Sequence, residues 1–291
     1  MDFKSSKKAA DFIWINGEFI PWEDAYIHVL THSLHYAGSV FEGERSYGGK
    51  IFKLMEHTKR LINSAEDMGL EVNYSVAEIN EATEELLKKN NLENAYIRPL
   101  VWRGAGALGV YGENMVSNLL IMAQNSNHPF KNGARLVLSK WRKPTIDAMP
   151  PQSKSSAHYA MQIVSQQMAK QQGYDDALLL DQYDDIAECT TTNIFFGKGR
   201  ELVTPIADRF LNGITRQTVI EMARAMGIRV REERLTLEDA EKYDTCFVTG
   251  TATEIKGVSS INYDYKKLEF PNDNMVKDLQ EEFAKIVGKQ I

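Results

Sequence analysis

The two most informative stretches of the chain are Pro151-Gln-Ser-Lys154-Ser-Ser-Ala-His-Tyr159 and Ile186-Ala-Glu188-Cys-Thr-Thr-Thr-Asn193-Ile-Phe-Phe196. Each follows a short apolar run and sets one ionisable residue among small or hydroxylic neighbours. Such a lysine and glutamate suggest an aldehyde cofactor held as an imine by the lysine, with the carboxylate against the cofactor's ring. The alternative is that Lys154 is a surface lysine and Glu188 a solvated turn residue, because both residue types are usually exposed.

Composition narrows the possible classes of protein. The chain has 291 residues, 43% of them hydrophobic and 25% charged, as in an ordinary soluble globular protein. A formal net charge of -6 and the absence of a basic stripe argue against nucleic acid as a partner. Two cysteines are too few for a disulfide framework or a zinc site. With neither a signal peptide nor a long apolar run, we expect no membrane span and a cytoplasmic location.

Strand and helix patterns alternate irregularly along the chain. Short β-branched or aromatic runs bounded by turn residues predict strands at Phe12–Asn16, Val40–Tyr47, Lys50–Leu54, Tyr96–Arg103, Asn118–Ala123, Ala134–Trp141, Asp176–Asp181, Asn193–Gly197, Glu201–Thr204, Arg229–Leu235 and Thr245–Thr249. Helical periodicity predicts helices at Thr58–Met68, Val76–Asn90, Ser155–Gln172, Thr215–Met226 and Asn274–Val287, and Thr236 begins a short capped helix.

The stretch from Gln124 to Gly133 has the composition of a loop, rich in Asn, Ser, Pro and Gly. It separates two self-contained sets of elements, so we expect domains at residues 1–123 and 134–291 with an interdomain loop at 124–133. The element order lacks the regular alternation of a parallel sheet. The predicted fold class is therefore α+β with two domains.

Three segments could bind an anion such as a phosphate. Asn212-Gly213-Ile214-Thr215-Arg216 precedes an apolar-periodic helix and would present free amides at its positive end. Thr249-Gly-Thr-Ala-Thr253 follows a strand and offers amides and hydroxyls. Arg60 opens a helix and could either bind a phosphate or pair with an acid on that helix. For the first two, the alternatives are an ordinary helix cap and a strand-terminating turn.

Two other signals carry little weight. Gly104-Ala-Gly106-Ala-Leu-Gly109 matches a dinucleotide fingerprint, but neither a helix start nor a suitably spaced acidic residue follows it. His32 and His35 are three residues apart with no glutamate between them and no further ligands nearby. We therefore expect neither a nicotinamide site nor a metal site.

An ordered set of motifs covering nearly the whole chain resembles the branched-chain amino acid aminotransferases, within the fold-type IV group of pyridoxal phosphate enzymes. Besides the Lys154 segment, the matching pieces are Trp14-Ile-Asn-Gly-Glu18, Trp22-Glu-Asp-Ala25, His35-Tyr-Ala-Gly-Ser-Val-Phe-Glu-Gly43, Glu56-His-Thr-Lys-Arg-Leu61, Tyr96-Ile-Arg-Pro-Leu100, Gly213-Ile-Thr-Arg216 and Gly250-Thr-Ala252 with Glu254. The fold expected from this resemblance has a small α/β N-terminal domain and a larger C-terminal pseudo-barrel domain.

The resemblance implies the residues that contact pyridoxal 5'-phosphate. Lys154 corresponds to the lysine that bonds the cofactor and then moves the proton, and Glu188 to the carboxylate facing the pyridine nitrogen. Such a carboxylate raises the pKa of that nitrogen, so the ring stays protonated and accepts electrons. The remaining contacts, to the phosphate and the phenolic oxygen, fall on Arg60, Tyr159, Thr251 and the amides of Ile214 and Thr215.

The resemblance also implies substrate contacts and a homodimer. The amides of Thr251 and Ala252 correspond to those holding the substrate α-carboxylate. Tyr36 corresponds to a tyrosine that enters the neighbouring subunit's pocket, and Arg45 is a further candidate for a structural or carboxylate-contacting role. The positions that line the substrate pocket are Phe41, Gly43, Tyr96 and Arg98.

The chain departs from the family pattern in three places. Relatives often have Ala-Gly-Gly-Asn where this chain has Ser155-Ser-Ala-His158, and Cys-Thr-Thr-Thr rather than a glycine-rich stretch follows Glu188. The segment 124–133 is shorter than usual and lacks the Trp and Tyr that help close the pocket over a branched side chain. These departures concern substrate preference rather than the catalytic residues.

The resemblance implies an aminotransferase that exchanges an amino group between leucine, isoleucine or valine and 2-oxoglutarate in amino-acid biosynthesis. Arg98 with Tyr96 would receive the distal carboxylate of glutamate, and a wall including Phe41 the aliphatic side chain. The alternatives are a D-amino acid or amine transaminase of the same fold, which the Tyr96–Arg98 segment disfavours, and a lyase resembling aminodeoxychorismate lyase. A binding protein without catalysis is disfavoured because Lys154 and Glu188 are both present.

Overall fold

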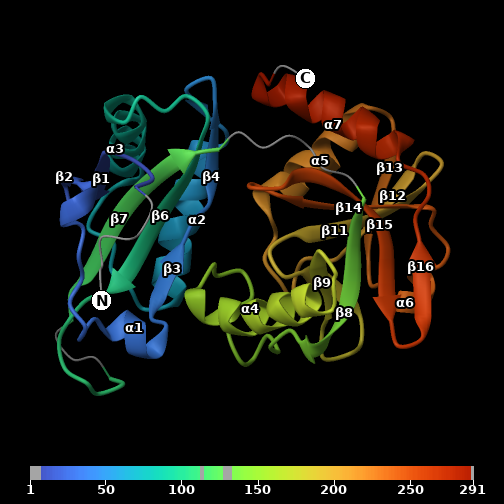
Figure 1. Ribbon diagram of the computed structural model, residues 1–291, viewed down its shortest axis with the longest axis horizontal. Coiled ribbons are helices and arrows are strands. Elements are labelled where there is room, and N and C mark those ends of the chain that lie inside the picture. Colours follow the sequence, from blue (N-terminus) through green and yellow to red (C-terminus); the bar gives the residue numbers. More distant parts are fainter. Residues whose placement is uncertain (1–7, 112–114, 127–132, 290–291) are drawn as a thin grey trace. The chain divides into compact units, whose positions relative to one another are not determined.

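The computed structural model describes residues 8–111, 115–126 and 133–289, and the chain divides into two compact units (Figure 1). The first unit comprises Met1–His128 and Ser153–Ala157, and the second comprises Pro129–Gln152 and His158–Ile291. Lys154 therefore clusters with the first unit, although the chain on both sides of Ser153–Ala157 belongs to the second. Part of the expected interdomain loop, residues 127–132, lies outside the described residues.

The first unit contains an antiparallel sheet in the order β2-β1-β7-β6-β4-β5, with β3 also paired to β6. Its strands are β1 (Phe12–Ile15), β2 (Glu18–Pro21), β3 (Ser39–Phe41), β4 (Glu44–Tyr47), β5 (Lys50–Ile51), β6 (Ala95–Arg103) and β7 (Ser117–Asn125). Its helices are the 3-10 helix η2 (Trp22–Asp24), α1 (His32–Tyr36), α2 (Leu54–Asp67) and α3 (Val76–Lys89).

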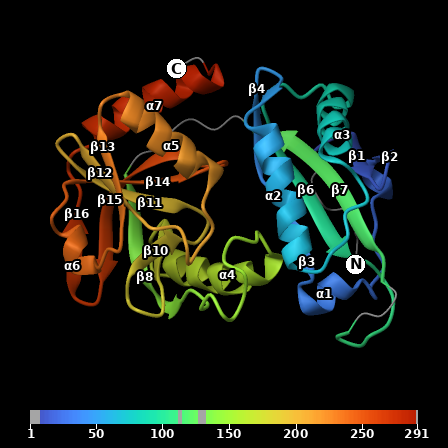
Figure 2. The ribbon, with the colours of Figure 1, turned by 180° about the vertical axis from the view of Figure 1, so that it is seen from behind.

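Helices α2 and α3 cover one face of this sheet, and Figure 2 shows α2 lying along β6. Their apolar stripes pack on the sheet in one cluster that includes Leu61, Ile79, Leu86, Ile97 and Ile121. Side chains alternate between the two faces of a strand. In the segment 40–46, the even-numbered side chains therefore point toward the helices. The odd-numbered side chains lie on the opposite face of the sheet, where the side chains of Tyr96 and Arg98 also lie.

The second unit is built on a mixed sheet in the order β10-β9-β8-β15-β14-β11-β12-β13, with β16 paired to β15. Strand β8 runs parallel to both β9 and β15, and β12 runs parallel to β13. The strands are β8 (Ala134–Arg142), β9 (Asp176–Leu180), β10 (Ile186–Cys189), β11 (Asn193–Lys198), β12 (Glu201–Pro205), β13 (Arg229–Glu233), β14 (Thr245–Gly250), β15 (Glu254–Tyr263) and β16 (Lys266–Glu269).

Four helices accompany this sheet in the described part of the second unit. They are α4 (Ser156–Gln171), which continues from the Ser153–Ala157 segment, α5 (Ile214–Ala225), α6 (Leu237–Ala240) and α7 (Asn274–Val287). Helices α5 and α7 contact each other and strand β14, with α5 also against β13 and α7 against β15. One apolar cluster on this sheet includes Leu178, Ile194, Phe196, Val248 and Ile261.

The predicted α+β class is confirmed, as are all five periodic helices to within a few residues. The capped turn at Thr236 is a capping box with Asp239. The predicted strand Val40–Tyr47 is interrupted at Glu42 and Gly43, and β7 extends into the expected loop as far as Asn125. The prediction missed β2, β10, β15 and β16, as well as the short helices η2 and α1.

Candidate active site

The backbone of Lys154 is held on both sides by the first unit. Its amide donates to Ser64 Oγ on α2 at 2.9 Å, and its carbonyl accepts from the Phe41 amide at 3.1 Å. A β-bridge joins Ser155 to Val40, and Ser153 Oγ donates to the Ser64 carbonyl. The half-buried side chain places Nζ 5.0 Å from the centre of the Phe41 ring. Lys154 is therefore not the surface lysine of the alternative interpretation.

Arg60 forms a two-point ion pair with Glu42, which is fully buried. The Arg60 Nε and Nη2 atoms lie 2.5 and 2.9 Å from the two Glu42 oxygens, and His57 Nδ1 lies 2.7 Å from Oε2. Burial by itself would raise the pKa of Glu42, but the Arg60 and His57 charges and hydrogen bonds lower it well below its ordinary value. Glu42, an acid of the β3–β4 segment, is thus a partner of Arg60.

Glu44 is a second buried carboxyl group on the same face of the segment. Among the described residues, neither of its carboxylate oxygens has a hydrogen-bond partner. Burial is the main cause that raises the pKa of Glu44 well above its ordinary value of 4.5, and the nearby charge of Glu42 adds to it. The folded chain therefore binds a proton at Glu44 that the unfolded chain releases above pH 4.5.

This difference predicts a pH-dependent effect of Glu44→Gln. Because the native pKa is raised, stability is fully present below pH 4.5 and falls as pH rises toward the native pKa. The variant has no carboxyl group to titrate at this position. The difference between its free energy of unfolding and that of the wild type should therefore increase in favour of the variant by up to about 1.4 kcal/mol per pH unit in this window. Urea unfolding of both proteins across a pH series from about 4 to about 9 measures the difference, and parallel curves would contradict the assignment.

The opposite face of the first sheet carries four predicted substrate residues. Arg98 Nη2 donates to the Tyr96 hydroxyl at 2.9 Å, and the Arg98 guanidinium carbon lies 4.5 Å from the centre of the Phe41 ring. A side chain at Gly43 would overlap the Tyr96 hydroxyl, so the glycine leaves room for this close approach. Arg45, by contrast, donates from Nη2 to the Ser126 carbonyl and stacks on Tyr47, which indicates a structural role.

Tyr36 lies on the exposed helix α1, and its hydroxyl donates to the Leu108 carbonyl at 2.7 Å. The nearby imidazoles contact backbone, His32 at the Val110 carbonyl and His35 at the Val29 carbonyl. Residues 104–111 form turns and a bridge rather than a helix start. Within the described ranges, no group of three side chains could hold a metal ion.

Glu188 lies buried on β10 in the second unit and forms an ion pair with Lys143. Lys143 Nζ lies 2.8 Å from Glu188 Oε1, and both side chains are at most 8% exposed. Asn193 Nδ2 donates to the other oxygen, Oε2, at 3.3 Å. Glu188 is therefore a fixed buried carboxylate rather than a solvated turn residue.

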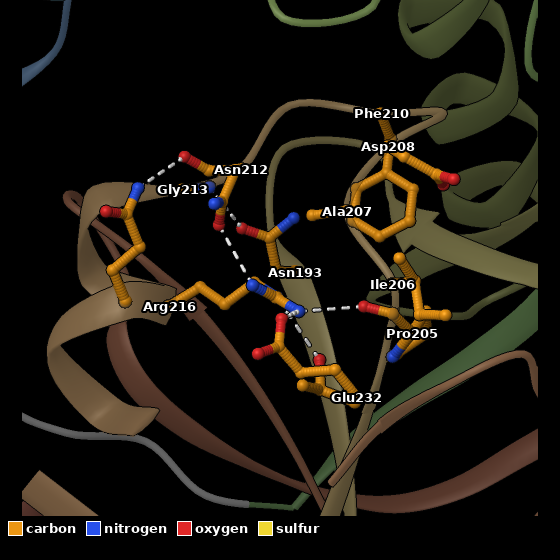
Figure 3. Close-up of polar contacts among 12 residues, drawn as sticks. Asn193, Pro205, Ile206, Ala207, Asp208, Phe210, Asn212, Gly213, Arg216 and Glu232 are labelled. Carbon is orange, nitrogen blue, oxygen red and sulfur yellow. Dashed lines mark hydrogen bonds and ion pairs between the residues drawn. The ribbon is translucent and has the colours of Figure 1, made fainter. Parts of the chain in front are cut away.

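Ile214 and Thr215 form the first turn of α5, a twelve-residue helix. Its N-cap, Gly213, has no side chain that could accept from the first amides, which lie at the positive end of the helix dipole and could bind an anion. The fully buried Arg216 anchors this turn (Figure 3): it donates to Asn212 Oδ1, the Pro205 carbonyl and Glu232 Oε2 at 2.8–2.9 Å. Because Arg216 fixes the turn, the amides of Ile214 and Thr215 are held in place, and fixed amide donors of this kind suit a phosphate.

Thr251 and Ala252 lie in the three-residue turn between β14 and β15, whose pairing closes at Gly250 and Glu254. In the part of the chain that the structure describes, the buried Thr249 hydroxyl near this turn has no hydrogen-bond partner. Since buried hydroxyls normally form hydrogen bonds, this hydroxyl could donate to a polar ligand. Tyr159 lies half-buried in the first turn of α4.

The residues that depart from the family pattern have structural partners. Ser155 Oγ accepts from the Ala157 amide at the start of α4, and the His158 ring contacts the Pro150 carbonyl at 3.1 Å. After Glu188, the Thr190 hydroxyl donates to Asp176 and the Cys189 amide donates to the Thr192 carbonyl. Ser155, His158 and Thr190 thus stabilise the local chain path through their side-chain contacts.

Sequence reasoning missed several residues that hold the candidate site in place. Ser64 and Lys143 lie outside the quoted motifs, and nothing in their local pattern reveals their partners. Glu42, Asn193 and Arg216 were within quoted motifs but received no role. Only long-range contacts identify all five.

Comparison with known proteins identifies the family. The amino-transferase class IV family model matches residues 39–261. The chain is 55% identical to the probable branched-chain-amino-acid aminotransferase of Rickettsia bellii (strain RML369-C), over 98% of this chain and 99% of that protein. It is 36% identical to the branched-chain-amino-acid aminotransferase of Escherichia coli (strain K12), over 88% and 86% of the two chains.

Solved structures agree with the sequence comparison. A T.th. branched-chain amino acid aminotransferase with pyridoxamine 5'-phosphate has a TM-score of 0.91 and 34% identity, over 98% of this chain and 96% of that one. The same enzyme has been crystallised with 4-methylvaleric acid and with N-(5'-phosphopyridoxyl)-L-glutamate. The chain therefore belongs to the amino-transferase class IV family and has its two-domain α+β fold of type IV. Its relatives within that family are branched-chain aminotransferases.

Proposed function

We propose that the chain is a pyridoxal phosphate-dependent branched-chain aminotransferase, which exchanges an amino group between leucine, isoleucine or valine and 2-oxoglutarate. Membership of the family and the names of the relatives support the reaction and the branched-chain substrates. The observation that supports this pair of substrates is the position of the Arg98 guanidinium against the Phe41 ring on one face of the sheet. A cation at the edge of an apolar wall can receive a distal carboxylate away from the aliphatic contacts.

The polar groups of the second unit fit this cofactor. The uncapped start of α5 suits its phosphate, and the buried carboxylate of Glu188 suits a protonated ring nitrogen. Arg60, Tyr159 and Thr251 complete the set of cofactor ligands that we propose. When bound, pyridoxal phosphate supplies an aldehyde that bonds the substrate amine and a ring that stores the electrons released with the Cα proton.

Lys154 is the residue to which we assign the movement of that proton. Its backbone is fixed by Ser64 and Phe41, so that only the side chain needs to move. The amine must be neutral to accept a proton from Cα, and it then returns the proton as an acid. Glu188 holds the proton at the ring nitrogen throughout. The α-carboxylate would bind the amides of Thr251 and Ala252.

We further propose that residues 1–123 form the small N-terminal domain and residues 134–291 the larger cofactor-binding domain, joined by the loop 124–133. A reducing cytoplasm is supported by the two cysteines, Cys189 and Cys246, which are both buried and free. None of the described helices has the length and apolar composition needed to cross a membrane. We also propose a role in branched-chain amino acid biosynthesis, in which the reaction runs from the branched-chain 2-oxo acid toward the amino acid.

We propose a homodimer assembled through the exposed apolar face around α1. Soluble monomers rarely expose large contiguous apolar patches, and here Tyr26, Ile27, Val29, Leu34, Leu108 and Val110 are each at least 50% exposed. Tyr36 lies within this face and would enter the partner's pocket. We expect light scattering to give the mass of two chains, and Leu34→Glu to shift the equilibrium toward monomer with loss of activity. A monomeric, fully active wild type would contradict the proposal.

A donor screen tests the reaction. With 2-oxoglutarate as acceptor, the cofactor-loaded protein should transfer amino groups from L-leucine, L-isoleucine and L-valine at least about tenfold faster than from D-alanine or a simple amine, which corresponds to about 1.4 kcal/mol in the barrier. Preference for D-alanine would support the D-amino acid transaminase instead. Release of pyruvate from aminodeoxychorismate without an oxo-acid acceptor would support the lyase.

A further inference from the structure

The side-chain amide of Asn193 joins two parts of the second unit that are distant in sequence (Figure 3). Its Oδ1 accepts from the Gly213 amide at 3.1 Å, which lies at the N-cap of α5. Its Nδ2 donates to the Leu211 carbonyl at 3.1 Å and to Glu188 Oε2 at 3.3 Å. The residue is 6% exposed, so these contacts are shielded from water.

The two ends of this connection carry different chemistry. On one side, Glu188 is a carboxylate whose other oxygen is held by Lys143. On the other side, Gly213 opens the uncapped helix whose first amides belong to Ile214 and Thr215. A primary amide can serve both because it offers donors and an acceptor in one plane. An aspartate in its place would lose both donors and would set a like charge beside Glu188.

The structure of Gly213 shows how closely the two parts approach. A Cβ atom added at this position would overlap Asn193 Oδ1, well inside van der Waals contact. The backbone angles of Gly213, φ −60° and ψ 137°, are accessible to any residue, so glycine is not required for its conformation. The absent side chain therefore makes room for the Asn193 amide.

We propose that Asn193 is a positioning residue that holds Glu188 and the first turn of α5 at a fixed separation. A single side chain then sets the span between the carboxylate that meets the ring nitrogen and the amides that receive the phosphate. This inference rests on the proposed function, because it needs one ligand to occupy both ends. Asn193 itself need not touch the cofactor.

The test compares apoenzyme binding of pyridoxal phosphate with binding of pyridoxal, which lacks the phosphate. In Asn193→Ala, loss of the Gly213 and Glu188 contacts should weaken pyridoxal phosphate about 10- to 100-fold and pyridoxal less, so the affinity ratio falls. The visible band of the bound cofactor should also titrate at lower pH, because Glu188 is no longer fixed. An unchanged ratio together with an unchanged spectral titration would overturn the inference.

Gly213→Ala provides an independent second variant if Asn193→Ala fails to fold. Its methyl group should push the Asn193 amide away and reproduce both changes. In the Asn193→Ala background the same substitution should cost much less, because the obstructing oxygen is gone. Equal effects in the two backgrounds would show that the sites act independently, and the proposed link would then be wrong.

Asn90 supplies a matched control in the first unit. Its amide also accepts from backbone amides, those of Asp11 and Phe12, and donates to the Phe12 and Leu86 carbonyls. Asn90→Ala should lower the melting temperature without changing the affinity ratio; a change as large as that of Asn193→Ala would mark a general effect of destabilisation and overturn the inference. A wild-type apoenzyme that binds neither compound would overturn the proposed function itself, whereas normal wild-type binding with an unaltered Asn193→Ala overturns only the positioning role.

Discussion

Lys154→Ala should lower the rate of amino-group transfer by about 10⁴-fold or more, because it removes both the covalent attachment point and the base that moves the Cα proton. The fold should survive, since the contacts with Ser64 and Phe41 use the backbone of residue 154. The measurement is the single-turnover rate with L-leucine, accompanied by thermal unfolding. Loss of the borohydride-reducible visible band should accompany the loss of rate.

Two comparison variants sharpen this result. Lys154→Arg keeps the positive charge but should be equally inactive, because a guanidinium does not deprotonate in proteins. Lys140→Ala removes an exposed lysine on β8 and should leave the rate unchanged. Full turnover in Lys154→Ala would defeat the proposed mechanism, and an equal loss in Lys140→Ala would show that the loss of rate is not specific to position 154.

Glu188→Gln should lower kcat by about 10²- to 10³-fold, a magnitude typical of removing one preorganised electrostatic contact. The carboxylate that keeps the ring nitrogen protonated is replaced by a neutral amide of similar shape. Cofactor should remain bound because the phosphate contacts are unaffected. Pre-steady-state loss of deuterium from leucine labelled at Cα measures the step, and an unchanged rate would contradict the electron-sink role.

The effects of Glu188→Gln on stability and on catalysis can be separated by a second substitution at Lys143. Glu188→Gln leaves the Lys143 ammonium, only 5% exposed, without its counter-charge, which should destabilise the fold by about 3–5 kcal/mol. Adding Lys143→Met removes that buried charge and should recover most of the stability. The rate should not recover with it. Recovery of both together would mean that the kinetic loss was only a consequence of unfolding.

The helices were predictable because each must bury one apolar stripe, and the periodicity of that stripe is local. Helix α7 was predicted with its observed bounds, Asn274–Val287, and buries one face through Leu279 and Phe283. Strand β15 was missed because its alternation of polar and apolar residues is broken near Val258–Ser260, where the pairing register with β8 also shifts. Strand β15 lies between β8, which is distant in sequence, and β14, which precedes it across a turn. No local sequence signal therefore indicates its central position in the sheet.

For the candidate site, the sequence alone determined where the residues predicted to carry the chemistry lie: Lys154, Glu188 and the Gly213 turn stand in short motifs whose ordered set resembles a known family. Only the tertiary structure decided what holds them. The Ser64 contact of Lys154, the Lys143 partner of Glu188 and the Asn193 connection to Gly213 are pairings between separate elements. Hydrogen-bond geometry depends on how strands and helices pack, and a linear pattern carries no record of that packing.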